Sequence, residues 1–168
     1  EIVDPVEVPS ISATSAADNF LLFTYCQGAE HKLGGDANCT VNFKYGMKRD
    51  FNAWLKTLGE TARVKTLTEL RQWNVAHQKA GAIKYGQALL DISDEMDVQM
   101  DRTRYQADRA KDIRLSATTG IDAVMKEQRL DALLFPGATG ALIASRPGYL
   151  SIIVPFGLIL NAPTPPFP

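Results

Sequence analysis

The side chains that could do chemistry stand too far apart in the sequence to form a familiar catalytic motif. His31 and His77 have no second histidine or cysteine at the spacing of metal ligands, and Cys26 and Cys39 do not match zinc-ligand spacing. Ser145 lies outside a Gly-x-Ser-x-Gly motif, and no nearby histidine or lysine marks it as an activated nucleophile. We therefore expect no catalytic residue within this chain.

Two further patterns suggest binding, but a structural explanation is the simpler one for each. Gly137-Ala-Thr-Gly140 lacks the lysine and hydroxyl residue of a phosphate-binding loop, and the spacing of a dinucleotide-binding motif is absent. An acidic group precedes the predicted long helix: Asp91, Asp94, Glu95, Asp97 and Asp101. These carboxylates complement the helix dipole, and they lack the alternate spacing and the glycine of a calcium loop. We expect neither a metal nor a cofactor.

The composition excludes several classes of protein. The 168 residues are 45% hydrophobic and 22% charged, which is enough for one soluble globular domain with a core. The net charge of -1 argues against nucleic acid as a partner, and no apolar run approaches the roughly 18 residues of a membrane span. Two cysteines are too few for a disulfide framework and favour a cytoplasmic protein, whereas the glycosylation triplet Asn38-Cys-Thr40 leaves secretion open.

Hydrophobic periodicity predicts several helices that would carry any site. Apolar residues three and four apart predict a helix ending near residue 58, within 43–58. Thr66-Leu-Thr-Glu69 has the spelling of a capping box and predicts the start of the next helix. A further helix is expected over 80–92, and the longest over about 96–128, where Gly120 permits a break.

Two nearly continuous apolar runs, 130–135 and 150–154, predict buried strands. Residues 1–9 suit a short edge strand, and residues 20–25 suit either a strand or the start of a helix. A long helix that leads into an apolar strand is typical of an α/β layered sheet. Because both apolar runs would need neighbours on two faces, we expect fold class α/β, as part of a larger sheet rather than a finished domain.

Short segments at fixed intervals complete the sequence pattern. They are Ile2-Val-Asp-Pro-Val-Glu-Val-Pro9, Phe43-Lys44 with Asp50-Phe-Asn-Ala-Trp-Leu55, Val64-Lys-Thr-Leu-Thr-Glu-Leu70 with Asn74-Val-Ala-His77, Tyr85-Gly-Gln-Ala-Leu-Leu90, Gly120-Ile-Asp-Ala123, Leu130-Asp-Ala-Leu-Leu-Phe-Pro136 and Gly148-Tyr-Leu-Ser-Ile-Ile-Val-Pro155. In this order and spacing, the series resembles the C-terminal half of the amidase-signature hydrolases, over residues 1–10 and 43–157.

The resemblance implies that residues 1–168 form the C-terminal portion of a single amidase-signature domain, within a mixed β-sheet core covered by helices on both faces. Residues 18–40 would be an atypical insertion, and residues 161–168 a Pro-rich end. The serine nucleophile, the bridging serine and the lysine of that family all lie upstream of the matched part, so no catalytic residue carries over. The implied substrate-binding residues are Phe135, Pro136, Gly137, Ala138 and Thr139. A plain turn that ends a strand explains Pro136-Gly137 equally well.

The function implied for the complete enzyme is hydrolysis of a carboxamide C–N bond through an acyl-enzyme. This chain would contribute scaffold and substrate pocket, and it would be inactive alone. Its implied partners are a small-molecule amide and the N-terminal half of the same enzyme, on the same or on a separate chain. The alternative is a non-enzymatic binding or inhibitory module derived from such an enzyme. The coding sequence upstream of Glu1 distinguishes the two.

Overall fold

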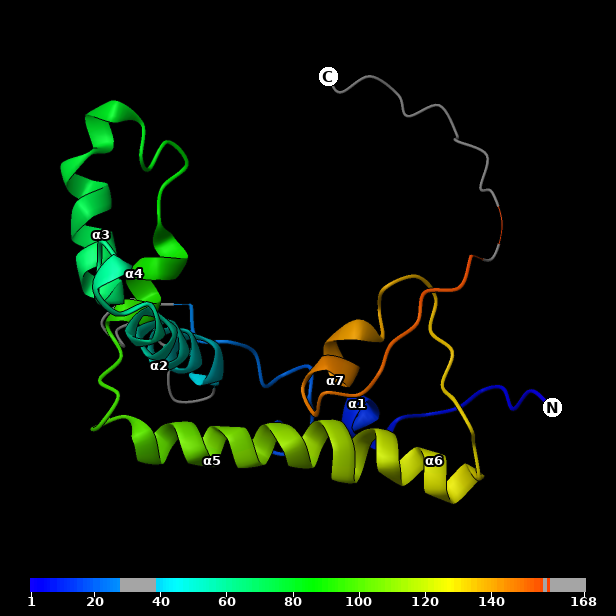
Figure 1. Cartoon of the computed structure of the whole chain (residues 1–168). Helices are drawn as coiled ribbons and strands as arrows, with labels where there is room; N and C mark the ends of the chain where they lie inside the picture. The colour runs from blue at the N-terminus through cyan, green and yellow to red at the C-terminus, as the bar shows by residue number, and fades with distance from the viewer. Residues whose placement is uncertain (28–38, 156, 158–168) are drawn as a thin grey trace, which may run out of the picture.

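The computed structural model describes residues 1–27, 39–155 and 157, which form helices joined by turns and extended segments (Figure 1). The predicted α/β fold is wrong for this part of the chain, because its one β feature is an isolated bridge between Tyr25 and Thr40. The Pro-rich end at 161–168 and residues 28–38 of the predicted insertion, including His31 and Asn38, lie outside the described residues.

Helices α2 (Asn42–Thr57), α3 (Leu67–Ala76) and α4 (Ala88–Asp94) pack together, and we call residues 42–94 the α2–α4 unit. The helix predicted over 43–58 is confirmed. The predicted start of α3 is also confirmed, because the Thr66 side chain accepts a hydrogen bond from the Glu69 amide at 3.1 Å. Short 3-10 turns follow α2 at Gly59–Thr61 and α3 at Gln78–Ala80.

The helix predicted over 80–92 is wrong in its first half. Residues 81–87 form turns, with positive φ angles of 89° at Gly81 and 79° at Gly86, and α4 begins only at Ala88. Glycine adopts these angles without steric cost, so the pair favours turns over helix. The helical periodicity of 80–92 alone did not reveal the two bends.

The long helix is built from α5 (Arg102–Ile113), a π-helical stretch at Arg114–Ile121 and α6 (Asp122–Gln128). It begins six residues later than predicted, because residues 96–101 form turns. The predicted break at Gly120 is confirmed by φ and ψ of -109° each. A side chain there would overlap the Leu115 carbonyl, so the bend requires glycine.

The remaining predicted strands are absent from the described residues. Residues 1–8 lead without pairing into the short helix α1 (Pro9–Ser12), and residues 20–23 form a turn. Residues 130–135 and 150–154, which we call the apolar segments, flank helix α7 (Ala141–Ser145) without strand pairing. A strand needs a neighbour to accept its backbone hydrogen bonds, and the described chain offers these segments none.

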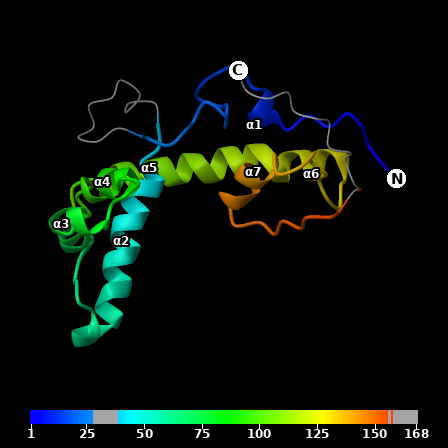
Figure 2. The same cartoon turned by 90° about the horizontal axis from the view of Figure 1, so that it is seen from above.

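Two hydrophobic clusters lie along the long helix. The larger joins α1, the 20–23 turn, the long helix and α7 through Val8, Phe20, Phe23, Leu115, Ile121, Val124 and Ile143. The smaller lies where α2 meets the start of α5, and consists of Cys26, Cys39, Val41, Tyr45 and Met96. Figures 1 and 2 show the long helix as a rod, with the α2–α4 unit projecting from its start and α1 and α7 packed toward its end.

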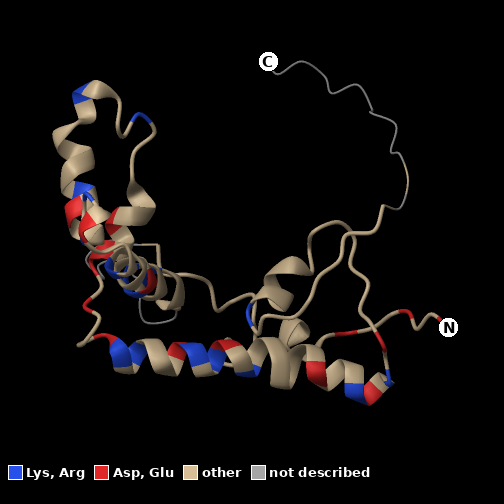
Figure 3. Ribbon diagram, viewed as in Figure 1, with Lys and Arg blue, Asp and Glu red and all other residues tan. Residues whose placement is uncertain are grey.

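Charged residues are distributed unevenly over this frame (Figure 3). Lys, Arg, Asp and Glu crowd α5 and the α2–α4 unit, whereas residues 130–155 contain only Asp131 and Arg146. No helix in the described ranges combines the length and the apolar character that crossing a membrane requires.

Candidate functional site

The loop predicted to bind substrate forms a closed turn between the first apolar segment and α7. The Thr139 hydroxyl donates to the Pro136 carbonyl at 2.9 Å, and Gly137 adopts a positive φ of 60°. Because the five predicted residues are consecutive, the turn keeps them together. The side chains of Pro136, Ala138 and Thr139 are exposed, as expected for a surface that binds something else.

Phe135 is the one member of this loop with a half-buried side chain. It packs against the larger hydrophobic cluster, and its ring lies where a Cβ on Gly140 would be. Gly140 is buried, so the ring and the glycine close the base of the turn. The fold therefore fixes Phe135 from behind and leaves the tip of the loop accessible.

A buried ion pair anchors the segment that follows the loop. Arg146, just after α7, donates to both carboxylate oxygens of Asp112 on α5, at 2.8 and 2.6 Å. The two side chains are 7% and 2% exposed. Arg109 also donates to the Arg146 carbonyl at 2.8 Å. The loop and α7 are thereby held to the long helix by charge as well as by the hydrophobic cluster.

A second polar contact fixes the start of the apolar segment 150–154. The Tyr149 hydroxyl donates to Asp122 of α6 at 2.5 Å, and this bond raises the pKa of Tyr149 above its ordinary value. The Tyr149 amide bonds to the Ala144 carbonyl at 2.9 Å. No backbone hydrogen bond joins residues 150–155 to another described residue.

The apolar segments expose large hydrophobic side chains. Leu134 is 93% exposed, Leu150 98%, Ile152 86% and Ile153 91%, whereas Leu115 in the larger cluster is fully buried. Burying each such side chain is worth about 1.5–3 kcal/mol. Contiguous exposed apolar patches are a common feature of interaction sites. The candidate site is therefore the 135–139 loop together with the two apolar segments that flank it.

Two surface hollows among the described residues lie away from this loop. One, of about 470 Å³, follows α2 and is lined by Phe43, Gly46, Met47, Asp50, Phe51 and Trp54. The other, of about 500 Å³, lies along α5 and the π-helical stretch, next to Tyr105 and Arg109. Both are shallow, and neither includes the candidate loop.

The remaining chemical candidates of the sequence have structural roles. The His77 ring stacks on Trp73 at 4.0 Å, and Ser145 bonds back to the Leu142 carbonyl at 2.9 Å. Among the described residues, no group of three or more His, Cys, Asp or Glu side chains could hold a metal ion.

The acidic group found in the sequence acts mainly through ion pairs and turns rather than through the helix dipole. Asp94 accepts hydrogen bonds from Arg71 at 2.5 Å and from Thr68 at 2.6 Å, and Lys48 lies at 3.4 Å. Burial raises the pKa of Asp94, but these partners outweigh it and hold the pKa below its ordinary value. Asp97 accepts from two amides of its own turn.

Sequence reasoning missed the disulfide between Cys26 and Cys39, which are 13 residues apart. It also missed Asp112 and Arg146, whose pairing joins residues 34 positions apart. The cysteine count allowed one bond, but nothing local indicated that these two sulfurs meet. For Asp112 and Arg146 the sequence holds no signal, because charged residues 34 positions apart form no local pattern.

No protein-family model, curated protein or solved structure matches this chain. The resemblance to amidase-signature hydrolases therefore stays a prediction that rests on the segments of the sequence.

Proposed function

We propose that this chain is the C-terminal portion of an amidase-signature hydrolase, and that it supplies scaffold and one wall of the substrate pocket. The observation that supports this is the exposure of the apolar segments on a frame that is otherwise anchored by buried groups. A chain that functioned alone would gain stability by burying Leu150, Ile152 and Ile153. These side chains are left for a partner to cover.

In this proposal, the N-terminal half of the enzyme covers the apolar segments. The two segments lie on either side of the 135–139 loop in sequence, so the same contact would place that loop beside the N-terminal half. Residues 147–155 carry no charge, so an apolar partner surface would meet no unpaired ion there. The loop would then form a pocket wall that neither half completes alone.

The chemistry of the complete enzyme would come from the upstream serine, bridging serine and lysine that the resemblance implies. The serine attacks the carboxamide, the C–N bond breaks with release of amine or ammonia, and water hydrolyses the acyl-enzyme. Backbone donors stabilise the oxyanion. Residues Phe135 to Thr139 would contact the small-molecule amide and take no part in bond breaking.

A non-enzymatic binding module is the second candidate, and the same exposed apolar segments are compatible with it. The proposal also concerns the cellular compartment of the protein. The small number of cysteines favours the cytoplasm, but the Cys26–Cys39 disulfide supports an oxidising compartment, where such bonds persist. We therefore favour the secretory alternative that the sequence left open.

The coding sequence upstream of Glu1 gives the first test. We expect a lysine codon followed, after several tens of residues, by a Gly- and Ser-rich stretch in the same reading frame. The encoded long chain should release ammonia from simple aliphatic or aromatic carboxamides, whereas the 168-residue chain should not. Replacing the serine of that stretch by alanine is the control. Activity of the pure 168-residue chain, or a start codon directly before Glu1, would contradict the proposal.

A further inference from the structure

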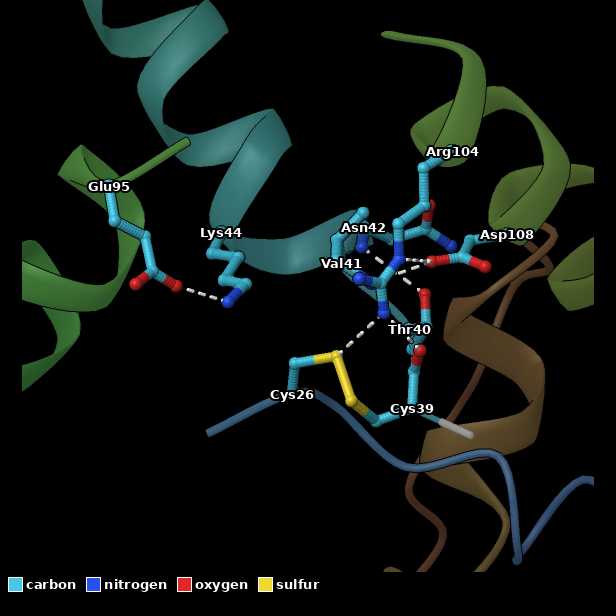
Figure 4. The surroundings of a disulfide bond; sticks show 9 residues. All are labelled: Cys26, Cys39, Thr40, Val41, Asn42, Lys44, Glu95, Arg104 and Asp108. Carbon is cyan, nitrogen blue, oxygen red and sulfur yellow. Dashed lines mark hydrogen bonds and ion pairs between the residues drawn. A yellow bond between two sulfur atoms is a disulfide. The ribbon is translucent and has the colours of Figure 1, made fainter. Parts of the chain in front are cut away.

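Beside the smaller hydrophobic cluster lies a junction that we call the elbow, formed by Cys26, residues 39–42 and the α5 residues Arg104 and Asp108 (Figure 4). The chain before the elbow belongs to the larger cluster through Phe20 and Phe23. The chain after it becomes α2, the first helix of the α2–α4 unit. The elbow thus ties the start of that unit to the segment that leads from the larger cluster, while α2 also packs on α5 through the stacked rings of Tyr45 and Tyr105, 4.3 Å apart.

Apart from the disulfide, few contacts join residues 24–26 to residues 40–43 at the elbow. The Cys26 amide bonds to the Thr40 carbonyl at 3.0 Å, and the Thr40 amide to the Thr24 carbonyl at 2.8 Å. The Tyr25 and Phe43 rings lie 5.6 Å apart. Two hydrogen bonds and one ring contact fix a segment weakly, because each contributes about 1 kcal/mol or less in other proteins.

The disulfide adds a covalent bond at the elbow, next to polar side chains of α5. Its cysteines are 3% and 8% exposed. Arg104 donates to the Cys39 carbonyl at 3.4 Å and lies 3.6 Å from the Cys26 sulfur. Asp108 accepts from the Val41 amide at 2.9 Å. Arg104 and Asp108 therefore hold both sides of the bond to the same helix.

We infer that the Cys26–Cys39 disulfide is a redox-sensitive clamp that fixes the start of the α2–α4 unit to the segment leading from the larger hydrophobic cluster. A dithiol opens it by a balanced exchange. The reagent's thiolate attacks the Cys39 sulfur, the S–S bond breaks, and Cys26 leaves as a thiolate that Arg104 stabilises. The reagent's second thiol then releases Cys39 and closes a cyclic disulfide. Two cysteine thiols remain, and the elbow keeps only its weak contacts.

Hydrogen exchange of the full 168-residue chain, followed by NMR with and without dithiothreitol, tests the clamp. We expect reduction to speed exchange of the Cys26, Thr40 and Val41 amides at least about tenfold, since a closed loop of this length strongly restricts the open chain. The Leu70 amide within α3, bonded to the Thr66 carbonyl, should exchange at an unchanged rate.

The double variant Cys26→Ser with Cys39→Ser is the matched control. It should show fast exchange at the elbow in both conditions, so that an effect of the reagent itself is separated from reduction. Unchanged exchange in the reduced chain would overturn the inference. Equal acceleration at Leu70 would also overturn it, because the bond would then stabilise the whole fold rather than the elbow. So would the finding of two free thiols in protein purified without reductant. None of these outcomes bears on the proposed hydrolase function.

Discussion

The α2–α4 unit and residues 130–155 are stabilised by different interactions. The first has ion pairs at its helix junctions, where Asp94 of α4 meets Arg71 of α3 and Lys48 of α2. The second is rich in apolar side chains but exposes many of them, and it is attached through the larger hydrophobic cluster and the buried pair of Asp112 with Arg146. Because the first region also exposes large apolar side chains, among them Trp54, Trp73 and Leu89, the contrast lies in how each region is anchored.

The largest effect should come from removing the anchor of the second region. We expect Asp112→Ala to lower the free energy of unfolding by about 3–5 kcal/mol, because it leaves the Arg146 charge buried without its partner. Urea titration followed by circular dichroism measures the loss. The control is Asp50→Ala, which breaks the exposed pair with Arg49 and should cost less than about 1 kcal/mol. Equal losses of unfolding free energy in the two variants would mean that the buried pair contributes no more to stability than the exposed pair.

The junction between the regions gives the next effect. Replacing both Cys26 and Cys39 by serine should destabilise the chain by about 3 kcal/mol, as expected for a bond that closes a loop of similar length. The midpoint of urea unfolding, compared with that of the oxidised parent chain, measures it, and the reduced parent chain should unfold near the midpoint of the variant. If the oxidised, reduced and double-serine chains unfold at one midpoint, the bond contributes nothing to stability.

Two aspartates should respond to pH in opposite directions. The pKa of Asp94 is held below its ordinary 3.8, so its contribution to stability is present above that pH and is lost as pH falls through the folded value. Asp94→Asn should cost about 2 kcal/mol at pH 7 and should flatten the loss of stability below about pH 5. Unfolding midpoints at pH 7, 5 and 3 measure both effects.

Asp108 at the elbow has a pKa shift opposite in direction to that of Asp94. Burial raises its pKa above the ordinary value, despite the bond from the Val41 amide and the charge of Arg104. Protonation therefore favours the folded chain at this site, and its contribution grows as pH falls through the raised folded pKa. Asp108→Asn keeps a carbonyl oxygen for Val41 and should change stability at pH 7 by less than about 1 kcal/mol. If Asp108→Asn lost as much stability at pH 7 as Asp94→Asn, the two aspartates would not differ as their pKa shifts predict.

The smallest effect is expected in the apolar segment itself. Ile152→Ser should change the stability of the 168-residue chain by less than about 0.5 kcal/mol, because the side chain is 86% exposed. Leu115→Ala, at a fully buried position, should cost about 2–5 kcal/mol in the same titration. In the long chain of the proposed enzyme, Ile152→Ser should become destabilising. A substantial cost in the short chain would show that Ile152 is already covered.

The same contrast explains what the sequence could predict. Local signals were sufficient for α2, for the capped start of α3 and for the bend at Gly120, because each depends on neighbours in the chain. The apolar runs at 130–135 and 150–154 indicated that their side chains need cover, but not what covers them, and the strand prediction failed there. The disulfide and the Asp112–Arg146 pair join distant positions and leave no local pattern. The 135–139 loop came from the resemblance alone, and its role stays a prediction.

Hydrogen exchange at residues 150–154 tests most directly whether the apolar segments are an interface for the N-terminal half. The amides of Leu150, Ser151, Ile152, Ile153 and Val154 should exchange within seconds in the 168-residue chain, where no described residue bonds to them. In the long chain they should be protected by at least about a hundredfold. Equally fast exchange in both chains, with Leu115 protected in each, would contradict the account.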